Sequence, residues 1–304
     1  MEKRLIVIVG PTAVGKTEFS VQLAELLHTE IISADSRQIF KELNIGTAKP
    51  SAEQLARVKH HFINSHSIEE DFDAGSFERN ALALLGELFQ HDDNVILCGG
   101  SGLYVRALCE GFDDMPEVAP ETRARIVEHY ERNGLRWLQQ QVSHKDPDYF
   151  AEVDQQNPHR LMRALELLET SGQPMATWRR KSSRTRPFSI VKIGLEMERE
   201  QLYARIDRRM DDMITAGLFD EAKALYPRRH LNALQTVGYR EIFDFLDGQY
   251  DRAEAVRLLK RNSRHYAKRQ LTWFKKDATI RWFDASDLRK LTADVKDHLG
   301  IPNT

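Results

Sequence analysis

The segment Gly10–Thr17 constrains the fold more than any other part of the sequence. It reads GPTAVGKT and fits the phosphate-loop pattern G-x-x-x-x-G-K-[ST]. Residues 4–9 (RLIVIV) predict a short buried strand before it, and residues 17–27 repeat apolar side chains at helical spacing after it. Glycines let backbone amides surround an anion, the helix N-terminus adds partial positive charge and Lys16 adds a full one. We therefore expect a bound diphosphate or triphosphate, with the Thr17 hydroxyl available to Mg²⁺.

Further strands and helices alternate along the chain. Residues 31–32, 94–98 and 191–195 predict buried strands, and residues 77–89 predict a helix. Such alternation is typical of a mostly parallel sheet flanked by helices, so we expect an α/β fold like that of P-loop NTPases. From residue 198 onward the sequence reads as helical throughout, including a basic run over residues 251–276.

The sequence changes character between residues 112 and 188. This segment begins with an acidic, proline-containing stretch (FDDMPEVAP), continues with helical, arginine-rich sequence and ends in SSRTRP. We interpret it as an α-helical insertion. Residues 1–111 would then form the first part of the P-loop core, and residues 189–304 would complete the core and add C-terminal helices.

Charge and cysteine content narrow the class of protein. Residues 1–120 hold 10 Lys and Arg against 19 Asp and Glu, whereas residues 121–304 hold 34 against 27. A polyanion would be attracted to the second part, although basic helices can equally be solvated surfaces. No apolar run reaches the roughly 18 residues of a membrane helix, and the early strand leaves no room for a signal peptide. With only Cys98 and Cys109, not spaced for metal binding, we expect a reduced cytoplasmic protein.

The phosphate loop alone does not define a reaction. Most such loops serve phosphoryl transfer, yet the strand ending LCGG lacks the Asp that NTPases usually place there. Asp35 is the carboxylate at a matching strand end. Because the carboxyl ends of the strands meet at one crevice in a doubly wound sheet, Asp35 should face the phosphate loop. It could be a general base, a helix cap or a Mg²⁺ ligand, and the residues alone leave these alternatives open.

Eight blocks lie in order along nearly the whole chain: GPTAVGKT (10–17), DSRQIF (35–40), NIGTAKP (44–50), GGSGLY (99–104), HRLMRALE (159–166), RIDRRM (205–210), QTVGYR (235–240) and AKRQLTWF (267–274). Together these blocks resemble the tRNA dimethylallyltransferase family of bacterial type. Two positions depart from the family. Phe40 stands where Tyr is common, and Ser101 replaces the usual Thr but keeps the hydroxyl. No Cys/His finger of the eukaryotic type follows.

The resemblance implies a magnesium-dependent prenyl transfer. The dimethylallyl group of dimethylallyl diphosphate would move to N6 of adenosine-37, next to the anticodon of a tRNA, and pyrophosphate would leave. Asp35 would be the general base and Arg209, with Arg205 beside it, would stabilise the departing diphosphate. Thr17 would hold Mg²⁺. The diphosphate would be bound by Gly10, Pro11, Thr12, Ala13, Val14, Gly15, Lys16 and Thr17.

The resemblance also distributes contacts to the tRNA anticodon stem-loop over several blocks. Arg179, Arg180, Lys181, Arg184 and Arg186 would grip the stem backbone, and Arg261, Arg264, Lys268 and Arg269 would add phosphate contacts. Trp273 and Phe274 are expected in the core. We expect a monomer that does not enter a membrane. The residues implied to contact tRNA are Asp35, Ser36, Arg37, Gln38, Ser101, Arg123, His159, Arg160, Leu161, Met162, Arg163, Gln235, Thr236, Val237, Gly238, Tyr239 and Arg240.

Three other functions are compatible with parts of the sequence. An adenylate isopentenyltransferase would prenylate a free nucleotide, but it would need no large basic insertion. A P-loop kinase for a small metabolite would use ATP, with Arg205–Arg209 as an arginine lid. A P-loop RNA-binding protein without activity would not need Asp35. Replacing Asp35 separates this last function from the transferase.

Overall fold

The computed structural model describes residues 2–111, 115–178 and 184–301. The chain divides into two compact units. Unit 1 comprises Met1–Glu110 and Arg186–Thr304, and unit 2 comprises Gly111–Thr185. These bounds lie close to those predicted for the insertion, 112–188. Among the described residues, no helix is both long enough and apolar enough to cross a membrane.

Unit 1 is built on a six-stranded sheet in the order β3-β2-β4-β1-β5-β6. Every neighbouring pair is parallel, which confirms the predicted α/β class. The expectation that everything after residue 198 is helical is wrong, because β6 forms the sheet edge; only Phe283 in it is buried, so it lacks the apolar run of a central strand. The strands are β1 (Arg4–Val9), β2 (Ile31–Ser33), β3 (His60–His61), β4 (Asn94–Gly99), β5 (Ser189–Glu196) and β6 (Arg281–Asp284).

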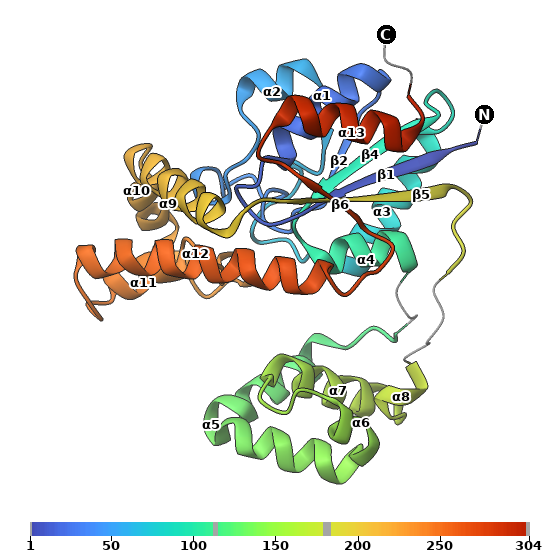
Figure 1. Cartoon of the computed structure of the whole chain (residues 1–304). Helices are drawn as coiled ribbons and strands as arrows, with labels where there is room; N and C mark the ends of the chain where they lie inside the picture. Colours follow the sequence, from blue (N-terminus) through green and yellow to red (C-terminus); the bar gives the residue numbers. More distant parts are fainter. Residues whose placement is uncertain (1, 112–114, 179–183, 302–304) are drawn as a thin grey trace. The chain divides into compact units, whose positions relative to one another are not determined.

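Helices cover both faces of this sheet. Figure 1 shows α1 (Lys16–Leu27) and α13 (Leu288–Leu299) over one face and α3 (Ala74–Leu88) and α4 (Gly102–Glu110) over the other. A second apolar cluster, centred on Tyr239 and Leu259, is surrounded by helices that follow β5. These helices are α9 (Arg199–Thr215), α10 (Leu218–Leu225), α11 (Arg240–Leu246) and α12 (Arg252–Phe274). The unit also contains α2 (Ala52–Arg57) and the short 3₁₀ turns η1 (Ile45–Thr47), η2 (Tyr226–Arg228) and η3 (Asn232–Leu234).

The centre of the sheet explains where the site lies. β1 is flanked by β4 and β5, and Leu5 to Val9 are fully buried, as the apolar run RLIVIV predicts. Because all strands are parallel, the loops after β1, β2, β4 and β5 leave the sheet at the same edge. The phosphate loop, the Asp35 turn, the GGSG loop and α9 therefore begin at one place.

Unit 2 is helical and has its own apolar core. Ile126, Leu138, Val142, Leu161 and Leu165 are almost completely buried in it. The longest helix, α5, is interrupted at Gly134, whose φ of 70° only glycine adopts easily. The helices are α5 (Pro120–Lys145), α6 (Pro147–Glu152), α7 (Pro158–Ser171) and α8 (Met175–Trp178).

Candidate active site

The phosphate loop joins β1 to α1 through a turn that requires glycine. Gly10 and Gly15 have φ angles of 149° and 110°, which side chains disfavour. A Cβ atom at Gly10 would lie 2.5 Å from the carbonyl oxygen of Leu195 in β5. Position 10 therefore needs glycine both for the turn and for the close approach of the neighbouring strand.

Lys16 is folded back over its own loop. Its Nζ donates to the carbonyl oxygens of Gly10 and Pro11, at 3.0 and 2.8 Å. Burial lowers the pKa of Lys16 to about 8, because partial removal from water disfavours the charged amine. The ammonium form still predominates at neutral pH. The loop thus carries a half-buried positive charge that a diphosphate can neutralise.

Gln270, which had no predicted role, joins the phosphate loop to the loop after β4. Its Oε1 accepts the N–H of Thr12 at 2.8 Å, and its Nε2 donates to the carbonyl oxygen of Gly100 at 3.0 Å. The side chain is 6% exposed. Its partners lie 258 and 170 positions away in sequence, so only the fold reveals the contact.

Asp35 follows β2 and lines the same cavity as the phosphate loop. Its Oδ1 accepts the N–H groups of Arg37 and Gln38, at 2.9 and 3.2 Å, and so caps the turn. Within the described part of the chain, both hydrogen bonds to this carboxylate use Oδ1. Oδ2 is therefore available to a substrate amine, and the capping role left open by the sequence is compatible with a role as base.

The Asp35 turn is fixed to the end of β4. The N–H of Ser36 donates to Oγ of Ser101 at 2.9 Å, and the two hydroxyls lie 3.2 Å apart. A Cβ atom at Gly99 would lie 2.1 Å from the carbonyl oxygen of Ala34. Glycine at position 99 therefore allows the two strand ends to touch, and this contact sets the position of Asp35.

Arg209 reaches the site from α9. Its Nη1 donates to Oγ1 of Thr12 and its Nη2 to the carbonyl oxygen of Ala48, both at 3.3 Å. Burial lowers the pKa of Arg209, and the nearby Asp35 opposes that shift. Arg205 and Arg208 line the same cavity. Together with Lys16, α9 therefore surrounds the cavity with the positive charge that a departing diphosphate requires.

These groups enclose a cavity of about 450 Å³. A smaller cavity of about 100 Å³ shares Thr12, Asp35, Arg209 and Tyr266 with it. Tyr266, on α12, is a second lining residue that the sequence did not mark. Burial raises the pKa of Tyr266, so its phenol keeps its proton. Two joined cavities, one cationic and one narrower, suit a ligand with a charged head and a small uncharged group.

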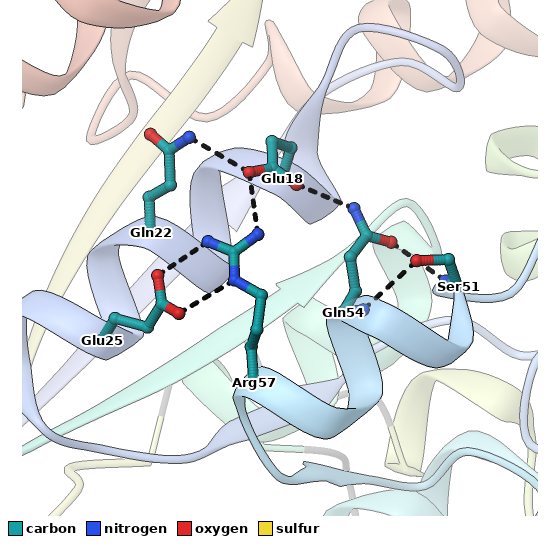
Figure 2. A network of polar contacts seen from close by, with 6 residues as sticks. All are labelled: Glu18, Gln22, Glu25, Ser51, Gln54 and Arg57. Atoms are coloured by element: carbon teal, nitrogen blue, oxygen red, sulfur yellow. Dashed lines mark hydrogen bonds and ion pairs between the residues drawn. The ribbon is translucent and has the colours of Figure 1, made fainter.

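A polar network holds α2 against α1 beside the large cavity. Glu18 accepts hydrogen bonds from Gln22, Gln54 and Arg57 at 3.0, 2.9 and 3.2 Å, and Arg57 also binds Glu25 (Figure 2). Glu18 and Gln54 line the cavity. Since α2 contributes no buried residue, these contacts rather than apolar packing hold it in place.

The donor set at the phosphate loop fits a Mg²⁺ ion bound largely by a diphosphate. Thr17 lines the large cavity, and Cys98 stands where many NTPases place an Asp. Over the described ranges, no cluster of three or more His, Cys, Asp and Glu side chains could hold a metal by itself. Mg²⁺ in such sites takes one or two protein ligands together with phosphate oxygens and waters, so the Thr17 hydroxyl is an adequate anchor.

Part of the segment predicted to contact RNA, 235–240, borders a third cavity of about 540 Å³. Gln235 and Arg240 are exposed there, beside Arg261 and Arg269. Thr236 and Val237 also line it. This grouping places cations from α11 and α12 around one hollow, a suitable arrangement for nucleic-acid phosphates.

Tyr239 and Gly238 do not belong to that surface. Tyr239 is 0% exposed and donates its hydroxyl to Oε1 of Glu221 at 2.6 Å. Gly238 is buried and has a φ of 103°, so it serves the turn. The prediction of a side-chain contact with tRNA at Tyr239 is therefore wrong, because the apolar cluster of α10 and α11 takes up its ring.

In unit 2, the Arg and His residues predicted to contact RNA lie on the surface. Arg123, His159 and Arg160 are exposed, and the Arg163 side chain is 41% exposed. Glu166, which is 4% exposed, lies 3.7 Å from Nε of Arg123 and 3.3 Å from Nη1 of Arg163. One buried carboxylate therefore orients two exposed guanidinium groups.

Other expectations for unit 2 need correction. Leu161 is 0% exposed in the unit's core and Met162 is half-buried against it, so the prediction of an RNA contact by Leu161 is wrong. The insertion is also not basic overall, since residues 111–185 hold 11 Lys and Arg against 12 Asp and Glu. The excess positive charge lies in residues 186–304, with 23 against 18.

The basic residues predicted to grip the stem or to add phosphate contacts differ in their surroundings. Arg186 is buried: it donates to Glu78 at 2.7 Å and to the carbonyl oxygens of Ala107 and Leu108, so a role on the RNA surface is wrong. Arg264 is bound by both carboxylate oxygens of Asp207. Arg179, Arg180 and Lys181 lie outside the described residues.

The aromatic pair after Thr272 is split. Phe274 is 3% exposed, which confirms its place in the core, whereas Trp273 is 39% exposed and the prediction for it is wrong. The indole covers Gly102, where a Cβ atom would lie 2.2 Å from Nε1 of Trp273. Packing against the start of α4 thus occupies one side of the ring and leaves the other at the surface.

Comparison with known proteins agrees with this geometry. The sequence model of the IPP transferase family matches residues 38–277. A tRNA dimethylallyltransferase of Cytophaga hutchinsonii is 51% identical over 296 residues, covering 97% of each chain. The tRNA dimethylallyltransferase 2 of Porphyromonas gingivalis is 51% identical over 279 residues, covering 92% of this chain and 93% of that one.

Solved structures give the same result. The tRNA isopentenylpyrophosphate transferase of Bacillus halodurans superposes with a TM-score of 0.73 at 40% identity, covering 99% of this chain and 96% of that chain. A eukaryotic dimethylallyltransferase acting on tRNA shares the fold, with a TM-score of 0.79 at 24% identity over 98% of this chain and 77% of that chain. The chain therefore belongs to the IPP transferase family, whose curated relatives are tRNA dimethylallyltransferases.

Proposed function

We propose that this protein transfers the dimethylallyl group of dimethylallyl diphosphate to N6 of adenosine-37, beside the anticodon of tRNA. The products are N6-dimethylallyladenosine and pyrophosphate. The observation that carries the proposal is that the phosphate loop, Asp35 and Arg209 line one cavity. The relatives' names, tRNA dimethylallyltransferase, support tRNA as the acceptor and dimethylallyl as the transferred group.

The reaction follows from the position of each group. N6 attacks C1 of the prenyl group, the bond from C1 to the diphosphate oxygen breaks, and the N6 proton passes to Oδ2 of Asp35. Lys16, the loop amides and Arg209 hold the pyrophosphate as its negative charge develops. Mg²⁺, held by Thr17, would supply further charge on the diphosphate oxygens.

The tRNA is proposed to contact both units. Arg123, Arg160 and Arg163 of unit 2 present exposed cations to the stem backbone. Arg240 and Arg269 of unit 1 do the same around the 540 Å³ cavity. The adenosine must leave its stack to bring N6 to Asp35. The cavity lies among the loops at the carboxyl ends of the strands, and a base still stacked in the RNA could not enter it. A monomeric state and a cytoplasmic location remain predictions.

A direct assay tests the substrate assignment. The purified protein is incubated with Mg²⁺, radiolabelled dimethylallyl diphosphate and unmodified tRNA, beside a parallel reaction that contains AMP. Label in tRNA alone, at the adenosine 3′ of the anticodon, supports the proposal. Label in AMP would instead assign the protein to the nucleotide prenyltransferases, and consumption of ATP without label in either acceptor would indicate a kinase.

A further inference from the structure

We propose that Glu221, on α10, is a positioning residue for the diphosphate site. It fixes the segment 44–48 and, through that segment, the guanidinium of Arg209. The inference rests on the proposed function, because it assigns Glu221 to the same diphosphate site. Glu221 itself lines neither cavity that contains Asp35 and Arg209.

Four donors converge on the Glu221 carboxylate. The N–H groups of Asn44 and Ile45 donate to Oε2 at 3.1 and 2.8 Å, and the N–H of Gly46 donates to Oε1 at 2.9 Å. The hydroxyl of Tyr239 donates to Oε1 at 2.6 Å. Three of these donors are consecutive backbone N–H groups at the start of η1. One carboxylate therefore accepts hydrogen bonds from all three N–H groups that open this turn.

The backbone at Gly46 is packed directly on Tyr239. A Cβ atom at Gly46 would lie 2.5 to 2.6 Å from three atoms at the hydroxyl end of that ring. Tyr239 is fully buried, and burial raises its pKa, so the phenol is protonated and acts as the donor to Glu221. The carboxylate and the ring together hold the segment from two sides.

The far end of the segment reaches the active site. Nε2 of Gln38 donates hydrogen bonds to the carbonyl oxygens of Thr47 and Ala48, both at 3.2 Å. The carbonyl oxygen of Ala48 also accepts a hydrogen bond from Nη2 of Arg209 at 3.3 Å. Thr47 and Ala48 line both cavities. If the segment 44–48 shifts because Glu221 no longer holds it, the Ala48 carbonyl oxygen that orients Arg209 therefore shifts with it.

Arg209 depends on that acceptor. Among the described residues its guanidinium has two hydrogen-bond acceptors, Thr12 and Ala48, and the residue is half-buried at the cavity. A donor held away from water that loses its acceptor is destabilised unless it pairs with another acceptor. Without Glu221, Arg209 would keep its charge but lose the orientation that directs its Nη2 to the carbonyl oxygen of Ala48.

The test is a double-mutant cycle on pyrophosphate affinity, measured by calorimetry on the full chain. The variants are Glu221→Gln, Arg209→Ala and the pair. Glu221→Gln should weaken pyrophosphate binding about tenfold when Arg209 is present and less than about twofold when it is absent, because the two residues act as a unit. Equal losses in both backgrounds, or no loss in either, would overturn the inference.

Two further variants make the result specific. Asp220→Asn removes an exposed carboxylate in the same turn of α10 and should leave the affinity unchanged. Tyr239→Phe keeps the Glu221 carboxylate and removes one of its four hydrogen-bond donors. This variant replaces Glu221→Gln if the latter does not fold. It should lose less pyrophosphate affinity than expected for Glu221→Gln, and the loss should again depend on Arg209. A protein that binds pyrophosphate in this pattern but prenylates no tRNA would refute the proposed function and leave the role of Glu221 intact.

Discussion

The two units of the chain present positive charge in opposite ways. In unit 1, Lys16 and Arg209 are enclosed and hydrogen-bonded to loop carbonyls. In unit 2, Arg123 and Arg163 extend into solvent, with side chains 69% and 41% exposed. Fixed, enclosed cations can stabilise charge that develops during a reaction, whereas exposed ones suit a phosphate backbone. We therefore expect substitutions of the cavity-lining cations of unit 1 to change the chemical step, and substitutions of the exposed cations of unit 2 to change RNA affinity.

The largest effect should come from Asp35→Asn. Asparagine keeps the Oδ1 acceptor that caps Arg37 and Gln38, so the turn should survive, but it cannot take the N6 proton. The kcat for prenyl transfer should fall by about 10² to 10⁴, while tRNA affinity measured by filter binding stays within about twofold. Unchanged turnover would show that Asp35 is not the base.

The second prediction compares the loss of unfolding free energy when a buried or an exposed arginine is replaced. Arg186→Ala leaves Glu78 buried without its arginine partner, so the free energy of unfolding should fall by about 3 kcal/mol. Arg228→Ala is the matched control, because its pair with Glu69 is exposed and should contribute less than about 1 kcal/mol. Denaturant unfolding measures both. If Arg186→Ala weakens tRNA binding and does not reduce stability, Arg186 contacts the RNA after all.

The paired substitution Arg123→Ala and Arg163→Ala tests unit 2. Loss of two phosphate contacts should raise the Kd for tRNA roughly tenfold and reduce the salt dependence of binding. The kcat at saturating tRNA should not change. Arg132→Ala, an exposed arginine on the same helix as Arg123, serves as the control. A fall in kcat would instead show that unit 2 takes part in the chemical step.

The smallest expected effect concerns pH. Burial lowers the pKa of Lys16 to about 8 from an ordinary value near 10.5, so the folded protein loses this charge between pH 7 and 9. Pyrophosphate affinity in metal-free buffer should therefore decrease roughly fivefold over that window, because the bound anion favours the charged amine. Lys16→Arg keeps its charge and should show a flatter profile. Parallel profiles for the two proteins would exclude Lys16 as the titrating group.

The sequence predicts the frame of the site well. The loop pattern between a buried strand and a helix places Gly10–Thr17, and the rule that parallel strands end at one edge places Asp35 opposite it. Both inferences use local pattern and topology, which a single sequence carries. The cavity that contains both residues agrees with them.

Residues that act through long-range contacts were not predictable in this way. Gln270, Tyr266 and Glu221 lie in helices whose periodicity is ordinary, and their partners are distant in sequence. Arg186 and Trp273 show the converse error: a basic residue near a basic tract is buried, and an aromatic residue is partly exposed. Residue type sets an average burial, but the packing around each position decides the individual case.

The proposed reaction moves a dimethylallyl group onto tRNA from a diphosphate bound at the phosphate loop. The most direct measurement is mass spectrometry of the nucleosides from an unmodified tRNA after incubation with the protein, Mg²⁺ and dimethylallyl diphosphate. We expect one N6-dimethylallyladenosine per tRNA, at the position 3′ of the anticodon, and one pyrophosphate released for each. Pyrophosphate release without a modified nucleoside, or a dimethylallyl group at another base, would show that the chain does not carry out this reaction.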